Sequence, residues 1–175
     1  MKSLKTLVSL SALAVCMGAA SMANAVSIAP ISSNFSASGS LTVKSPSSFQ
    51  LPITCDVKFD GSVNNVGIAS ITKVTVSGSN NLCKLPQITG VPWTLTATSL
   101  SGTSGGGNVT NVGYTIPATV LYPASNCGPS TVTVAYNNST GVLTTSPTSQ
   151  PLGSSCTLQS LSVTVTTSPL LQIVP

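Results

Sequence analysis

The ionisable side chains that could do chemistry gather in one short stretch, LPITCDVKFD, at residues 51–60. Asp56 and Asp60 are the two acidic residues of the chain, and Lys58 lies between them. Glycosidases use such paired carboxylates at separations of about 5–9.5 Å. In an extended strand, residues four positions apart lie about 13 Å from each other, because each residue adds about 3.3 Å. The two aspartates are therefore too far apart to form that pair.

Other catalytic and metal-binding chemistry has few residues to draw on. The sequence has no His, which is the usual general base and the usual partner of a catalytic thiol. Calcium takes six to eight oxygen ligands, so two carboxylates and the carbonyls of Asp60-Gly61 would form only a weak site. We therefore expect a protein that is not an enzyme and that has no catalytic, cofactor-binding or metal-binding residues.

The start of the chain, residues 1–25, has the pattern of a secretory signal peptide. Lys2 and Lys5 form a basic segment, and an apolar run over residues 7–17 follows. That run is too short to cross a bilayer as a helix. Small residues then lead up to the expected cleavage after Ala25. We exclude this segment from the fold and expect a secreted protein, extracellular or at the cell surface, that passes through the periplasm.

A competing interpretation of the same segment is a lipoprotein, in which Cys16 of the sequence LAVC would carry the lipid. Such a signal has a small residue before the cysteine, whereas Val15 is branched. This difference favours a discarded leader. No second apolar run is long enough to predict a transmembrane segment.

Four cysteines follow the leader, and an even number in an exported chain predicts disulfide bonds. They form two pairs with almost the same separation, and each second cysteine precedes a strand-like segment, PWTLTAT or LSVTVTT. This pattern indicates a duplicated module and favours Cys55–Cys83 with Cys127–Cys156. Zinc sites have shorter cysteine spacings or accompanying His, so structural disulfides are the preferred interpretation.

Apolar and polar residues alternate in several segments rich in Val, Ile and Thr, which is the pattern of half-buried strands. Clusters of Gly, Asn, Ser and Pro separate these segments, as turns do. Together they predict an all-β fold, an antiparallel β-sandwich or barrel. The alternating segments are residues 40–44, 51–60, 73–77, 93–98, 131–136 and 161–166.

Two segments depart from this pattern and set the expected domain organisation. Residues 26–40 are polar and predict an extended N-terminal arm, followed by a single all-β domain over 41–175. Residues 99–113 are rich in Gly, Ser, Thr and Asn and predict a flexible loop. The triple glycine at 105–107 lacks the Lys and the helix that a phosphate-binding loop needs.

Within the segment 51–60, alternation places Cys55 on the dry face and the three charged side chains on the wet face of an edge or outer strand. Trp93, the one tryptophan of the chain, follows a Gly-Val-Pro turn. The simpler interpretation of Trp93 is a core anchor. The alternative is an apolar contact for a ligand or partner.

The mature chain carries very few charges, and after Lys84 no charged side chain occurs. Four scattered lysines do not form the basic cluster that nucleic-acid binding needs, so we expect no nucleic-acid partner. A surface with little net charge favours association. It suits a hydrocarbon or other apolar interface, self-association, or contact with other cell-surface proteins. We expect any such contact on the second half of the chain.

Several features together resemble the secreted bacterial PraB family, whose members are named as protein activators of alkane oxidation. They are the signal peptide, Leu82-Cys83, the turn Gly90-Val91-Pro92-Trp93 before a Thr-rich strand, the second cysteine pair, and the ending SPLLQIVP. The similarity covers nearly the whole mature chain. It implies an exported, non-catalytic protein that helps bacteria assimilate hydrocarbons, and no catalytic or binding residues come with it.

Two functions therefore stand as hypotheses. The first is a secreted accessory protein that promotes alkane uptake at the cell surface or the oil–water interface. The alternative is a structural subunit of an extracellular fibre or biofilm matrix, which the low charge and a free N-terminal arm would suit. A donor strand needs a sustained row of alternating apolar residues, and the arm loses that row after Pro30.

Overall fold

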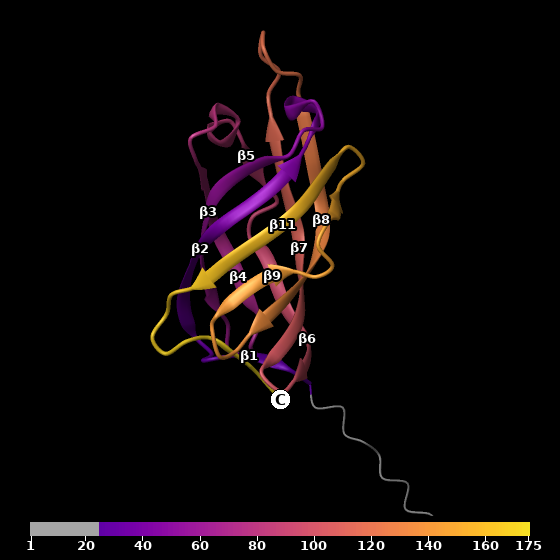
Figure 1. Ribbon diagram of the computed structural model, residues 1–175. Coiled ribbons are helices and arrows are strands. Elements are labelled where there is room, and N and C mark those ends of the chain that lie inside the picture. Colours follow the sequence, from indigo (N-terminus) through magenta and orange to yellow (C-terminus); the bar gives the residue numbers. More distant parts are fainter. Residues whose placement is uncertain (1–24) are drawn as a thin grey trace, which may run out of the picture.

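The computed structural model describes residues 25–175, which form an antiparallel β structure (Figure 1). The predicted leader over residues 1–25, apart from Ala25 itself, and the alternative lipid site Cys16 lie outside the described residues. In residues 25–175 no helix is long and apolar enough to cross a membrane. The strands are β1 (Ser27–Ala29), β2 (Ser33–Lys44), β3 (Ile53–Val63), β4 (Ala69–Ser77), β5 (Gln87–Thr89), β6 (Trp93–Ser101), β7 (Ser104–Ile116), β8 (Ser125–Asn137), β9 (Val142–Thr145), β10 (Gln150–Leu152), β11 (Cys156–Val165) and β12 (Gln172–Val174).

Eight of these strands close into a barrel, with the order β11-β2-β3-β4-β6-β7-β8-β9 and a final pairing of β9 with β11. Strand β10 extends from β11, β5 pairs with β7, and β1 pairs with β12 in a separate small sheet. The predicted all-β antiparallel fold is confirmed in its barrel form. Closure removes the exposed edges that an open sheet would present.

Strand β3 shows how alternation builds the barrel wall. Cys55, Val57 and Phe59 are buried, while Asp56 and Lys58 are exposed. The predicted wet and dry faces are therefore confirmed. Of the two predicted positions, edge or outer strand, the edge position is excluded, since β3 pairs with β2 on one side and β4 on the other. A closed barrel has no edge for this strand to occupy.

The predicted N-terminal arm over residues 26–40 does not exist as a separate arm. Strand β2 runs across the expected boundary at residue 40 and pairs with both β3 and β11. Its inward side chains, such as Phe35 and Ala37, are buried. A Cβ at Gly39 would overlap the carbonyl oxygen of Ser162 on β11, so the glycine permits the strands to approach. The first part of β2 consists mainly of Ser, Ala and Gly, so it lacks the alternation of large apolar and polar residues from which a strand is predicted.

The predicted flexible loop over residues 99–113 is also wrong. Strands β6 and β7 form a hairpin there, with a tight turn at Gly102-Thr103. Added side-chain carbons would collide with Ile173 at Gly105 and would lie 2.9 Å from the Thr96 carbonyl oxygen at Gly107. The glycines therefore make room for close packing, and this need outweighs their low strand propensity.

The two ends of the barrel differ. The small β1–β12 sheet lies at the end near the C-terminus (Figure 1), where Ile28, Leu171 and Ile173 are buried. At the opposite end lie two short 3₁₀ helices, η1 (Pro46–Ser48) and η2 (Asn81–Lys84), and the connection over residues 117–124. We call this opposite end the loop end.

Candidate functional site

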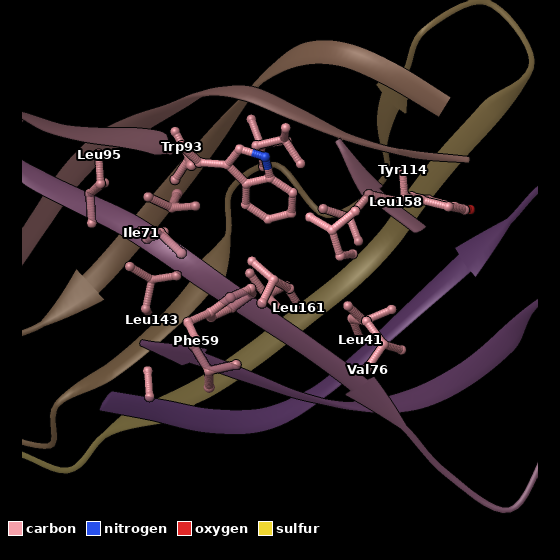
Figure 2. A pocket seen from close by; sticks show the side chains of 18 of the residues that line it. Leu41, Phe59, Ile71, Val76, Trp93, Leu95, Tyr114, Leu143, Leu158 and Leu161 are labelled. Carbon is pink, nitrogen blue, oxygen red and sulfur yellow. The ribbon is translucent and has the colours of Figure 1, made fainter. Parts of the chain in front are cut away.

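The barrel encloses an apolar cavity of about 140 Å³. Figure 2 shows side chains from several strands pointing into the same space. They come from inward positions of strands whose outward positions are polar, which is the alternation expected of a barrel wall. Eight-stranded barrels have an interior that side chains just fill or that holds one small ligand. Labelled lining residues are Leu41, Phe59, Ile71, Val76, Trp93, Leu95, Tyr114, Leu143, Leu158 and Leu161.

Trp93 is a core residue, as the simpler interpretation of the sequence predicted, and it also lines the cavity. It is buried, and its ring centroid lies 6.2 Å from that of Phe59 in a tilted arrangement. Its indole Nε1 donates a 2.8 Å hydrogen bond to the carbonyl oxygen of Thr89. With this polar atom satisfied, the rest of the ring lines the cavity. Whether a ligand touches Trp93 stays a prediction.

At the end near the C-terminus, the cavity is bounded by Tyr136 and by residues of the small β1–β12 sheet. Tyr136 lines the cavity there, and its hydroxyl donates a 2.8 Å hydrogen bond to the carbonyl oxygen of Leu171. Burial raises the pKa of Tyr136 to about 12. Ile28 and Ile173 from the small sheet also line the cavity. The N- and C-terminal strands together therefore form the floor of the cavity.

A cluster of serines forms the roof at the loop end. Ser45 and Ser47 line the cavity, and their hydroxyl oxygens lie 3.0 Å apart. Ser125, at the start of β8, donates a 2.9 Å hydrogen bond from its hydroxyl to that of Ser47. Tyr114 also lines the cavity, and its hydroxyl is buried without a hydrogen-bond partner. Burial raises the pKa of that hydroxyl, and the nearby Ser45 side chain opposes the shift.

Both predicted disulfides are present and brace this loop end. Cys55 on β3 is bonded to Cys83 in η2, with their Cα atoms 5.6 Å apart. Cys127 on β8 is bonded to Cys156 on β11, with a Cα separation of 5.4 Å. The pairing that spacing favoured is thus confirmed. The duplication that suggested it stays a prediction.

The charged stretch that drew attention in the sequence lies on the outside of the barrel. Lys58 Nζ is 3.2 Å from Asp60 Oδ1, and the Ser36 hydroxyl donates to the same carboxylate. The hydrogen bond from Ser36, and then that from Lys58, hold the pKa of Asp60 below its usual value. In the described residues no three potential ligands among His, Cys, Asp and Glu come together. The cluster is a solvated ion pair, and such pairs contribute little to the free energy of unfolding.

One further spacing, Ser70 and Lys73, matches the S-x-x-K pattern of serine hydrolases that use a lysine. Both lie on β4, where a register irregularity between Asp60 and Gly61 of the neighbouring strand brings them to the outer face. Ser70 is half-buried and Lys73 is exposed, and no hydrogen bond joins them. A catalytic lysine is activated when burial removes its amine from water, whereas the amine of Lys73 stays in contact with solvent.

Sequence patterning did not identify the cavity or its roof. Alternation on each strand shows which side chains point inward, but the space left between them depends on how all strands close together. The signal for the roof was equally weak, because Ser45 and Ser47 look like ordinary turn residues in a Ser-rich chain.

Fold and site define a small antiparallel β-barrel with an apolar interior and two disulfides at one end. The chain matches the family described as alkane oxidation protein activator PraA/PraB-like over residues 1–175, and it belongs to that family. The expected resemblance is therefore confirmed over the full length. No curated protein and no solved structure matches the chain.

Proposed function

We propose that this protein is a secreted, non-catalytic accessory factor that binds small hydrocarbons inside its barrel and so promotes alkane oxidation. The observation that carries the proposal is the apolar cavity of about 140 Å³. An engineered cavity of about 150 Å³ lined by Leu, Ile and Phe stays dry and binds benzene. The family description supplies the link to alkanes.

The expected affinity follows from the number of carbons transferred from water. Each buried methylene contributes about 0.8 kcal/mol, so six carbons contribute about 5 kcal/mol. This corresponds to a Kd of a few tenths of a millimolar. Such weak binding suits a carrier that must release its cargo. The volume of the cavity, which is close to that of a cavity that holds benzene, limits the ligand to about six non-hydrogen atoms unless the barrel widens.

Benzene titration followed by ¹H–¹⁵N NMR tests the proposal. We expect saturable shifts in amides next to the cavity, such as those of Ile71, Val109 and Val134, with a Kd below about 1 mM. Amides of the exposed charged stretch, such as Lys58, should not move. Absence of saturable shifts at the cavity up to the solubility limit of benzene would contradict the proposal.

A second feature favours contact with a hydrocarbon–water interface. Two connections at the loop end, residues 45–52 between β2 and β3 and residues 117–124 between β7 and β8, carry large apolar side chains exposed to solvent. A 2.8 Å hydrogen bond from the Ser47 amide to the hydroxyl of Ser125, which follows the second connection, joins the two segments. Neither connection carries a charge. Exposed apolar groups of this kind mark contact sites. The side chains and their exposed fractions are Phe49 66%, Leu51 63%, Val120 103% and Leu121 73%.

We expect the triple variant Phe49→Ser, Val120→Ser, Leu121→Ser to adsorb at a hexadecane–water interface at least tenfold more weakly. Burying one such side chain contributes roughly 1.5–3 kcal/mol to the free energy of adsorption. A tenfold change corresponds to about 1.4 kcal/mol, so the loss of three side chains should exceed it. Pendant-drop tensiometry measures the adsorption. The matched control is Ile31→Ser with Val66→Ser, which removes exposed apolar groups from connections outside the loop end. Equal losses in both variants would contradict a specific role of the loop end.

The fibre alternative loses one of the features that favoured it. The residues of the expected N-terminal arm pair within the chain as β1 and β2, so a donor-strand exchange would first have to break these pairings. The low charge that also favoured a fibre is unchanged, and the alternative stays a hypothesis.

A further inference from the structure

The cavity is apolar along most of its length but ends, at the loop end, on hydroxyl groups. Its lining includes no charged side chain. Tyr114 in Figure 2 reaches past the apolar cluster, with its hydroxyl oxygen directed away from the aromatic ring of Trp93. An interior of this kind offers an aliphatic chain a dry wall and offers one end of that chain a polar contact.

The hydroxyl protons at the roof can be counted from their hydrogen bonds. Ser125 donates its hydroxyl proton to the oxygen of Ser47. Ser45 and Ser47 lie 3.0 Å apart and share a hydrogen bond in which either can be the donor, so that bond uses only one of their two hydroxyl protons. The Tyr114 hydroxyl, which lies near the Ser45 side chain, is buried without a hydrogen-bond partner. The roof of the cavity therefore combines an unsatisfied tyrosine hydroxyl with a serine pair that has a spare proton.

An unsatisfied buried hydroxyl is unfavourable by about 1–3 kcal/mol, which a ligand with its own polar end would relieve. A carboxylate is the wrong polar end, because burying an unpaired charge without a cation is far more unfavourable than burying a neutral group. A neutral hydroxyl can accept a proton from Ser45 or Tyr114 and donate its own to the other oxygen.

We propose that the barrel binds short aliphatic primary alcohols in preference to the corresponding hydrocarbons and carboxylates, with the alcohol hydroxyl bridging Tyr114 and Ser45. This inference rests on the proposed function, since it assigns a ligand class to the same cavity. Hydroxylation of a terminal carbon converts an alkane into such an alcohol. The site would then hold the product of an oxidation step as well as its hydrocarbon substrate.

The test compares three ligands with six non-hydrogen atoms each: benzene, 1-pentanol and butanoate. Titrations followed by NMR give Kd for the wild-type protein and for two variants. Tyr114→Phe should raise the Kd of 1-pentanol about fivefold, the loss of one net hydrogen bond, and leave that of benzene within twofold. The matched control is Tyr136→Phe. Tyr136 lines the same cavity, but its hydroxyl already donates to the carbonyl oxygen of Leu171. This control should leave the ratio of the Kd of 1-pentanol to the Kd of benzene unchanged.

The outcomes separate the two proposals. Binding of benzene and 1-pentanol with no change of their ratio in Tyr114→Phe would overturn the alcohol inference and leave hydrocarbon binding intact. Butanoate binding as tightly as 1-pentanol would also overturn it. Failure of both neutral ligands to bind the wild-type protein would overturn both proposals. Thermal unfolding of Tyr114→Phe provides a check on folding, and its Tm should not fall, because the substitution removes an unpaired buried hydroxyl.

Discussion

Replacing Ala97 by Leu is expected to weaken benzene binding more than tenfold while leaving the barrel folded. Ala97 is buried on β6 and lines the cavity. The three added carbons would occupy space that a six-carbon ligand needs. Overpacking destabilises a full core, but here the addition enters an existing cavity, so the Tm should stay the same or rise. NMR titration and thermal unfolding measure the two effects.

The neighbouring residue supplies the control for this variant. Thr96 precedes Ala97 on the same strand and is exposed, so Thr96→Leu adds an apolar side chain outside the barrel and should leave benzene binding unchanged. In bacteria that lack the gene, we expect Thr96→Leu to restore growth on hexane and Ala97→Leu to restore it poorly. Full restoration of growth by Ala97→Leu, with binding abolished, would separate the cavity from the physiological function.

Removal of the disulfide Cys127–Cys156 is expected to lower the free energy of unfolding by about 3–4 kcal/mol. The estimate follows from the entropy of closing a loop of this length in the unfolded chain; the two cysteines are 29 positions apart. A domain of this size is stable by about 5–15 kcal/mol, so the loss is a large fraction of the total. Urea unfolding of the double variant Cys127→Ala, Cys156→Ala measures it.

The first disulfide gives a comparison for the second. Cys55–Cys83 closes a loop of nearly the same length, with a separation of 28 positions, so chain entropy predicts an almost equal loss for its double Ala variant. A much smaller loss for either bond would show that the unfolded chain is already restricted there, or that the loop end does not depend on that bond. Removing both bonds should leave the protein marginally stable or unfolded.

The sequence predicted most where side chains were large and alternated. The inward row Cys55, Val57, Phe59 and the strand around Val163 could be read directly, and the cysteine spacing indicated the correct pairs. The failures share one cause. Strands β2 and β7 contain Ser, Ala and Gly where neighbouring backbones approach closely, and such residues carry little hydropathy signal although closure requires them.

The candidate site was less predictable than the fold. Trp93 was identified as an apolar residue that could contact a ligand, and the structure places it in the cavity wall. Tyr114 and Ser45 were missed because they belong to segments distant in sequence, which only barrel closure brings together. An unfilled volume and an unpaired hydroxyl arise from three-dimensional packing, so no local pattern could announce them.

Barrel closure joins the beginning of the described chain to its end. Strand β2 pairs with β11, and β1 pairs with β12. The barrel cannot close until almost the last residue is available, and folds dominated by such distant pairings form slowly. For a chain carried across a membrane from its N-terminus, this order would keep the polypeptide unfolded during transit. If the protein is secreted as proposed, the native cavity would first form after the chain has crossed the membrane.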